Sequence, residues 1–350
     1  MTPTTSGTGA APLRTHPPTN LRVSAAFATA TETPEHVRIA EELGFERAWL
    51  YDTPQQSPDV WMCLALAAER TTSIGVGPGV LVPTLRHPMV NASAAAALER
   101  LAPGRVAVGF GTGYTGRLAM GQARPISWSY MTRYITTFRA LLRGETAEWD
   151  GGRLRMLHPG ESRPTGHDSI PVYVSAIGAK GIAVAQSLTD NLLVIGGVPT
   201  GIEKFRNVSV LAYGTVLDDG EPLDSDRLRA AAGPALAQTF HISYELGGKD
   251  AVRLLPGGPE WLAGIEDIPD GERHLAIHTG HLIHMNHADI AAWDAGAHTM
   301  LEQVTLTGTA GAVRDKVQAL KAQGATEILY QPTGDIRREL ERFADAMGMS

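Results

Sequence analysis

Cysteine is almost absent from this chain of 350 residues: Cys63 stands alone, so no internal disulfide can form. Its place in the apolar helical pattern WMCLALAAE favours a buried small side chain over a nucleophile. No run of Lys and Arg is longer than two residues and the net charge is −7, which argues against nucleic-acid binding. No apolar stretch approaches the ~20 residues that a membrane span needs. We therefore expect a cytoplasmic protein without a membrane or nucleic-acid partner.

The first 20 residues lack the apolar side chains of a folded segment and the pattern of a secretion signal. They are rich in Thr, Pro, Gly and Ser, and we expect a disordered leader. Residues 21–350 contain no internal repeat and no obvious linker, and we expect a single domain there. A hydrophobic content of 43% is enough for a large core.

Eight short segments read as strands, and helical patterns separate nearly all of them. The strands are expected at 21–27, 46–52, 73–82, 104–113, 171–176, 191–197, 207–217 and 326–332. Parallel strands need such crossovers, and eight of them close a (β/α)8 TIM barrel. Insertions are expected after strands 4 and 7, at about 111–170 and 247–305. A doubly wound open sheet is the alternative fold.

Three expectations concern the connections between these strands. The segment 199–206 reads as a short helix, and the helix after the seventh strand should be interrupted near Gly233 and Pro234. Residues 247–305 read as irregular and carry many histidines.

The third strand has an unusual composition, because Gly75, Gly77, Pro78 and Gly79 interrupt its aliphatic side chains. Glycine weakens a strand, so a cluster of glycines indicates a bulge, or a place where another backbone or a flat ligand comes close. A twisted barrel strand with a glycine corner and no ligand explains the pattern equally well.

The carboxyl ends of the expected strands share one rim of a barrel, where catalytic sites lie. Asp52, the GFGTG of 109–113 and glycines at several other strand ends meet there, which suggests a pocket for a wide, flat ligand. Gly178 and Lys180 open the helix after the fifth strand, where free backbone N–H groups can hold a phosphate. Gly178 and Lys180 are equally compatible with an ordinary loop that binds no phosphate.

Four segments together resemble the bacterial luciferase-like superfamily of flavin-dependent and F420-dependent oxidoreductases. They are ERAWLYD, SIGVGPGVLVPTLRHP, LERLAPGRVAVGFGTG and IPVYVSAIGAKGIAVAQ. The resemblance covers residues 21 to about 215 and 305–346. The third-strand segment is most similar to the branch that contains methylenetetrahydromethanopterin reductase. The resemblance implies hydride transfer between coenzyme F420, or alternatively FMN, and a small organic substrate, in a homodimer.

The resemblance also implies roles for individual residues. It places a cis peptide at Gly79–Val80 beneath the cofactor ring, and Asp52 near the reactive face. Thr53 and Tyr114 replace an acid–base pair of some relatives, which speaks against sugar-phosphate dehydrogenation. The catalytic candidates are Asp52 and His87. The cofactor-binding candidates are Asp52, Gly79, Val80, Gly111, Gly113, Tyr114, Ser175, Ala176, Gly178, Ala179 and Gly196.

Several of these side chains have an ordinary structural alternative. Asp52 could cap the loop before the second helix, and backbone groups could satisfy His87. Tyr114 could be a loop aromatic rather than a pocket residue. Arg117 and Arg124 could reach an anionic tail or simply be solvated.

Five histidines punctuate the segment HLAIHTGHLIHMNH, at positions 274, 278, 281, 284 and 287. Their spacing resembles a metal cluster on a helix, but Thr279 and Gly280 break that helix and no carboxylate or cysteine pattern completes a site. We expect no metal. A lid over the substrate pocket is the preferred interpretation, with His278 and His281 as substrate contacts.

Two other classes of protein compete with the oxidoreductase. A non-catalytic flavin-binding relative would keep the phosphate site and lose the open ring face, but it would have no use for long insertions. An unrelated barrel lyase or isomerase would carry a lysine or metal-binding carboxylates at its strand ends, and no such lysine is evident.

Overall fold

The computed structural model describes residues 21–113, 115–122, 125–158 and 169–349. The expected leader at 1–20, Tyr114 and Arg124 lie outside the described residues. No helix in the described part of the chain combines the length and the apolar character that crossing a bilayer requires.

Eight parallel strands form one sheet with the order β3-β2-β1-β10-β9-β8-β7-β4. They are β1 (Arg22–Phe27), β2 (Arg47–Leu50), β3 (Gly75–Pro78), β4 (Val108–Phe110), β7 (Val172–Ser175), β8 (Asn191–Ile195), β9 (Asn207–Tyr213) and β10 (Glu327–Gln331). Isolated parallel bridges, Val76 with Val106 and Leu81 with Phe110, bring the two edges of this sheet together. The TIM-barrel prediction is confirmed, and the open doubly wound sheet was the wrong alternative.

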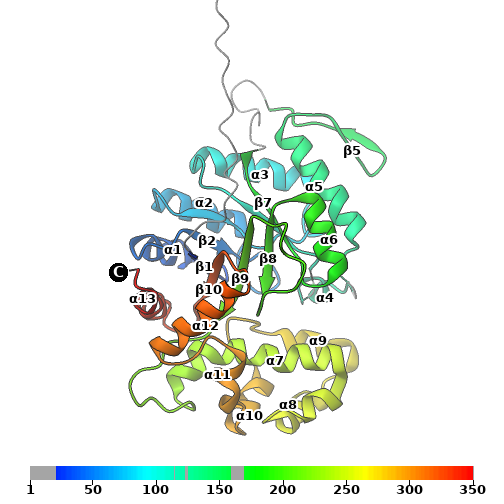
Figure 1. Ribbon diagram of the computed structural model, residues 1–350. Coiled ribbons are helices and arrows are strands. Elements are labelled where there is room, and N and C mark those ends of the chain that lie inside the picture. The colour runs from blue at the N-terminus through cyan, green and yellow to red at the C-terminus, as the bar shows by residue number, and fades with distance from the viewer. Residues whose placement is uncertain (1–20, 114, 123–124, 159–168, 350) are drawn as a thin grey trace, which may run out of the picture.

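Helices cover the outside of the barrel (Figure 1). They are α1 (Thr33–Glu42), α2 (Val60–Arg70), α3 (Pro88–Leu101), α5 (Trp128–Leu142), α6 (Ala179–Leu188), α12 (Ala310–Ala322) and α13 (Ile336–Met347). The connection after β4 also holds α4 (Thr115–Ala119) and the hairpin of β5 (Ala147–Trp149) and β6 (Gly152–Leu154). No helix forms at 199–206, where the described backbone makes turns and Gly201 adopts a φ of 81°. That expectation was wrong, because a glycine in this conformation ends any helix.

A second group of helices, the helical layer, lies below the barrel in Figure 1. It consists of α7 (Asp226–Arg253), α8 (Gly258–Glu266), α9 (Asp270–His278), α10 (His287–Asp294), the 3-10 turn Ala297–Met300 and α11 (Leu301–Val304). The layer has its own apolar core, which includes Phe240, Trp261 and Trp293. It meets the carboxyl ends of the strands, since Thr333 after β10 donates to the carbonyl of Ala231 at 2.8 Å.

The helical layer corrects two expectations. Residues 247–305 are mostly helical rather than irregular. Helix α7 continues through Gly233 and Pro234 and departs from helical geometry only at Gly248. The reason is tertiary packing: a Cβ on Gly233 would lie 2.3 Å from the sulfur of Met285, so the helix is pressed against the following loop there. Such burial overrides local helix propensity.

The interior of the barrel is filled by its own side chains. Trp49, Tyr51, Tyr173, Leu193 and Leu329 form a buried cluster. A polar group lies among the amino-terminal ends of the strands, where Ser24 of β1 and Ser209 of β9 both donate to the buried carboxylate of Glu327 in β10. This end of the barrel is therefore tied together by hydrogen bonds across three neighbouring strands.

The glycines of β3 allow close packing. A Cβ on Gly77 would lie 2.0 Å from the carbonyl oxygen of Ala107, and a Cβ on Gly79 would lie 2.8 Å from Cε3 of Trp49. Both contacts involve the protein itself, so close approach of a second backbone explains Gly77. The peptide between Gly79 and Val80 is cis, as the family resemblance implied.

We predict that Gly77→Ala lowers the free energy of unfolding by about 1–3 kcal/mol, because the new methyl group must displace the backbone of the neighbouring strand. Urea denaturation followed by circular dichroism measures this loss. The matched control is Gly271→Ala at the start of α9, where a Cβ meets nothing within 4 Å and should leave stability unchanged or slightly raised. Equal stability of the Gly77→Ala variant and the wild type would contradict the packing argument.

Candidate active site

Asp52 is the second residue after β2, and its side chain is buried. Its Oδ2 accepts a hydrogen bond from Nη1 of Arg86 at 2.6 Å, and Nη2 of the same guanidinium donates to Oδ2 of Asp59 at 2.6 Å. Asp59 caps α2, since its side chain accepts from the backbone amides of Trp61 and Met62. The capping role that sequence reasoning considered for Asp52 thus belongs to Asp59.

The electrostatics of Asp52 favour contact with a ligand. Burial raises the pKa of this carboxyl, whereas the Arg86 guanidinium acts in the opposite direction. Oδ1 of Asp52 is buried and has no hydrogen-bond partner among the described residues. An orphaned buried oxygen at the rim of a barrel can accept a donor from a bound molecule.

Several predicted cofactor residues form one contiguous surface. A Cβ on Gly111 would lie 2.6 Å from Cγ2 of Val80 and 3.8 Å from Cβ of Ser175. The structure therefore brings together the ends of β3, β4 and β7 around the Gly79–Val80 peptide. The side chain of Val80 also packs against the buried cluster inside the barrel, which supports this surface from beneath.

Exposed backbone lies beside this surface, at the ends of β7 and β8. A Cβ on Gly178 or Gly196 would meet nothing within 4 Å, whereas Ala176, just after β7, is buried. Gly178 is the N-cap of α6 and supplies no side-chain cap, so backbone N–H groups of Ala179 and its neighbours are available to an anion. These residues fit the phosphate and the flat ring that the sequence analysis assigned to this rim.

The remaining candidates lie around the loop after β4 and the start of α3. Gly113 adopts a φ of 69° and packs against Val82, and Arg117 donates to Oγ1 of Thr84 at 2.8 Å. His87 is the exposed N-cap of α3, where its Nδ1 accepts from the amide of Met89. Its ring packs edge-on against Trp149 of the hairpin. The catalytic role of His87 stays a prediction.

Sequence reasoning missed a chain of hydrogen bonds at the barrel mouth. The hydroxyl of Tyr51 donates to Oε1 of Gln331 at 2.7 Å, and Nε2 of Gln331 donates to the carbonyl of Leu282 at 2.9 Å. Leu282 belongs to the helical layer and packs on the cluster inside the barrel. No local sequence pattern predicts these hydrogen bonds, because Tyr51, Leu282 and Gln331 are far apart in the chain.

A pocket of about 580 Å³ opens beside this link, between the ends of β1 and β10 and the helical layer. Its lining includes Phe27, Pro234, Leu282, Met285 and Gln331, so it is largely apolar with a few polar groups. A pocket of this kind and size is typical of small-molecule sites.

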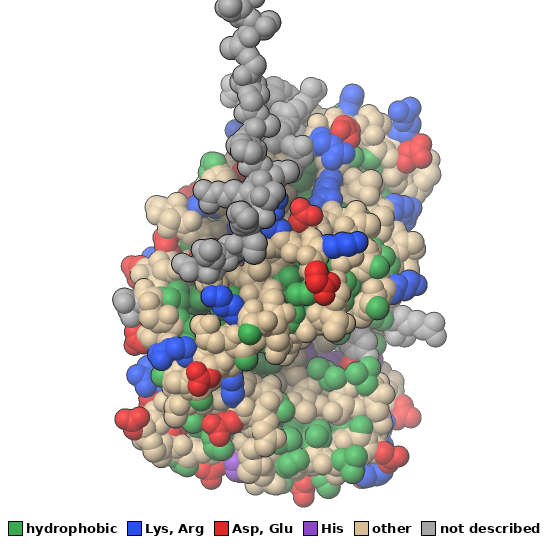
Figure 2. Space-filling view, in the orientation of Figure 1, with side chains coloured by type: hydrophobic (Ala, Val, Ile, Leu, Met, Phe, Trp, Pro, Cys, Tyr) green, Lys and Arg blue, Asp and Glu red, His purple; other side chains and the backbone are tan. Residues whose placement is uncertain are grey.

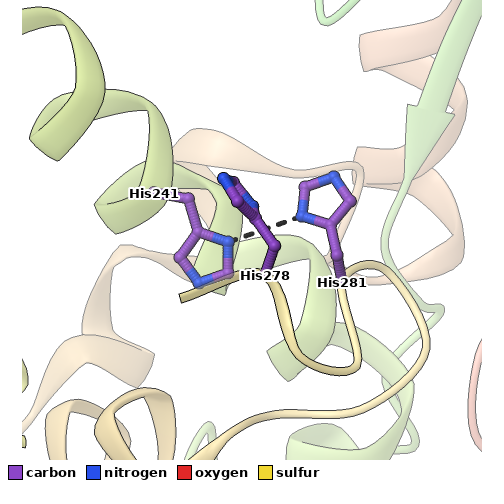
Figure 3. A group of neighbouring side chains, drawn as sticks. All are labelled: His241, His278 and His281. Carbon is purple, nitrogen blue, oxygen red and sulfur yellow. Dashed lines mark hydrogen bonds between the residues drawn. The ribbon is translucent and has the colours of Figure 1, made fainter. Parts of the chain in front are cut away.

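Three histidines of the helical layer lie together, as Figure 3 shows. His241 comes from α7, His278 ends α9, and His281 follows in the loop. Burial, and then the two neighbouring imidazoles, lower the pKa of His281 to about 3, so it is neutral at physiological pH. The structure brings the predicted pair His278 and His281 together. Sequence reasoning missed His241, which lies on a separate helix.

Comparison with known proteins identifies the class. The sequence profile of the family described as luciferase-like monooxygenase matches residues 9–327, and the chain belongs to this family. The chain is 28% identical over 172 residues to 5,10-methylenetetrahydromethanopterin reductase of Methanolobus tindarius, covering 48% of this chain and 51% of that one.

Two further comparisons extend this result. The reductase of the same name from Archaeoglobus fulgidus is 28% identical over 225 residues, covering 61% of this chain and 66% of that one. The alignments thus span between half and just under two thirds of these relatives. The coenzyme F420-dependent tetrahydromethanopterin reductase of Methanopyrus kandleri has the same fold, with a TM-score of 0.66 at 19% identity over 93% of this chain and 98% of that one.

We predict that Arg86→Met lowers the free energy of unfolding at neutral pH by about 3 kcal/mol, because it leaves the Asp52 carboxylate buried without its cation. The pKa of Asp52 then rises further. The loss in free energy of unfolding is largest above that raised pKa. It disappears as the pH falls toward the ordinary value of 3.8, where Asp52 is protonated in both the folded and the unfolded chain.

Urea denaturation at several pH values measures this effect. Arg253→Met is the control, because the pair of Arg253 and Asp250 is exposed and its loss should cost less than about 1 kcal/mol. A penalty for Arg86→Met that does not depend on pH would show that packing, and not the charge of Asp52, explains the loss.

Proposed function

We propose that this protein is an oxidoreductase that transfers hydride between coenzyme F420 and a small organic substrate. The observation that carries the proposal is the surface of Gly79, Val80, Gly111 and Ser175 beside the orphaned Oδ1 of Asp52. Similarity to methylenetetrahydromethanopterin reductases, and the shared fold with an F420-dependent one, support this cofactor.

An FMN-dependent monooxygenase is the second candidate, and the family's own description as luciferase-like monooxygenase favours it. Both cofactors present a flat ring, so the same rim suits either. The third-strand sequence, which resembles the F420 branch, decides our order of preference.

The proposed roles follow from the geometry. When bound, the cofactor supplies the hydride chemistry. The chain's part is to hold the ring on the surface at Gly79 and Val80, to place its phosphate at the uncapped start of α6, and to keep Asp52 oriented. Arg86 performs the last task, because its two nitrogens are shared between Asp52 and Asp59 and fix the carboxylate in one position. Leu282 and Gln331 shield the ring from water.

Substrate, assembly and location follow as parts of the proposal. The apolar pocket beside Leu282 suits a small organic molecule. The contacts of His278 and His281 with that substrate stay predictions. Exposed apolar side chains on α2 and α3, among them Met62, Leu66 and Val90, suit the surface of a homodimer. The single buried free thiol of Cys63 agrees with a cytoplasmic location.

Titration of the purified protein with F420 and separately with FMN, followed by fluorescence quenching, tests the cofactor. We expect saturable binding of F420 that is tighter than binding of FMN. Tighter binding of FMN would reverse the order of the two candidates. Binding of neither would remove the oxidoreductase proposal.

Asp52→Asn tests the role of the carboxylate without changing the shape of the side chain. We expect weaker cofactor binding or turnover by at least about tenfold, since hydrogen bonds to charged groups contribute about 1.5–3 kcal/mol. Asp250→Asn is the control, because its side chain is exposed in the helical layer. Unchanged binding and turnover in the Asp52→Asn variant would dismiss the assigned role.

A further inference from the structure

Figure 3 marks the contact between His241 and His281 with a dashed line, and the length of this contact bears on what the three histidines can bind. Nδ1 of His241 lies 3.4 Å from Nδ1 of His281, whereas hydrogen bonds between nitrogen and its acceptors are usually 2.7–3.2 Å long. Two nitrogens held at about 2.0–2.1 Å by one tetrahedral ion lie about 3.4 Å apart. The third ligand atom, from His278, lies within 4.8 Å of the other two.

Carboxylates fix the protonation of two of these rings. Nε2 of His241 lies 3.0 Å from Oδ1 of Asp289, and Nε2 of His278 lies 2.5 Å from Oε1 of Glu245. An ionised carboxylate only accepts hydrogen bonds, so Nε2 carries the hydrogen in both imidazoles. In the neutral rings, Nδ1 of each then presents a lone pair. This is the tautomer that a metal ligand needs, with the carboxylate as its outer support.

Nδ1 of His278 has no other use in the fold. The atom is buried and has no hydrogen-bond partner among the described residues. A buried polar atom without a partner costs free energy, so its persistence calls for an absent ligand. A network of histidines and carboxylates alone would leave this nitrogen unsatisfied.

Asp289 is itself held rigidly. Its Oδ1 also accepts from Nε1 of Trp261 at 2.8 Å, and its Oδ2 accepts from the amide of Asn286 at 3.0 Å in the capping box of α10. Both oxygens are therefore engaged, and the His241 ring is fixed in one orientation before any ion arrives.

We propose that His241, His278 and His281 bind one divalent transition-metal ion of the zinc class, each through Nδ1. Three imidazole ligands suit zinc and related ions, and three protein ligands leave the fourth position for water or an oxygen of a ligand. The proposal departs from the sequence-based expectation of no metal, because His241 was not part of that motif.

The position of the site gives the ion a role. His281 immediately precedes Leu282, which rests on the barrel mouth and receives the hydrogen bond of Gln331. The ion would join α7, α9 and this loop, and so fix the covering of the mouth. His241 comes from α7, whereas His278 and His281 lie close together in the chain, and the backbone amide of His281 donates to the carbonyl of His278.

Metal binding by the cofactor-free protein tests the proposal, independently of the hydride-transfer activity. The full-length protein, treated with a chelator and dialysed, is titrated with ZnCl2 by calorimetry and with CoCl2 by visible absorption. We expect one ion per chain and the intense visible bands of tetrahedral cobalt. Glu245→Gln, which weakens the outer support of His278, should lower the affinity by about 10–100-fold.

His281→Ala should lower the affinity more than Glu245→Gln and abolish the cobalt bands. His287→Ala is the matched control, because this histidine is exposed outside the group and its loss should leave binding unchanged. Circular dichroism shows whether each variant is folded. Wild-type binding no tighter than that of folded His281→Ala, or a weak octahedral cobalt spectrum in the wild type, overturns the proposal.

Discussion

The barrel closes where the backbones of Gly77 and Ala107 approach so closely that a side chain on residue 77 would have to displace its neighbour. Val76 pairs with Val106, just before β4, and Leu81 pairs with Phe110 of β4. Gly77 lies between these two bridges, where a Cβ would come 2.0 Å from the carbonyl oxygen of Ala107. The Gly79–Val80 peptide lies between the same two bridges, and Val80 packs beside Gly111. The surface proposed for the ring therefore lies where the barrel closes.

Charged side chains lie at the rim beside this apolar surface, and one of them contacts two carboxylates. One guanidinium, that of Arg86, serves both the buried Asp52 and the helix cap Asp59. The carboxylate at the rim is thus held by the same group that stabilises the start of α2. One interaction therefore both orients the Asp52 carboxylate and engages the cap of α2.

Local patterns predicted the barrel well, because the apolar residues of each strand and of most helices form a recognisable pattern within a short stretch of sequence. The strand expected at 207–217, for example, begins where β9 (Asn207–Tyr213) begins. Such patterns could not predict contacts between residues that are distant in the chain. The pairing of Arg86 with Asp52, the link from Gln331 to Leu282 and the place of His241 depend on residues distant in the chain. Gly233 and Pro234 are buried within α7, and Gly233 lies against Met285, a contact that no short window of sequence contains.

Charged side chains of both signs are interspersed over the face shown in Figure 2, whereas the pocket beside Leu282 has a largely apolar lining. Leu282 packs on the buried cluster of the barrel and also lines the pocket, together with Phe27 and Pro234. Phe27 belongs to the barrel, whereas Pro234 and Leu282 come from α7 and the loop after α9, so the pocket depends on two separate parts of the fold. Substitutions in α7 or in this loop can therefore change the size of the pocket while the strands of the barrel stay the same.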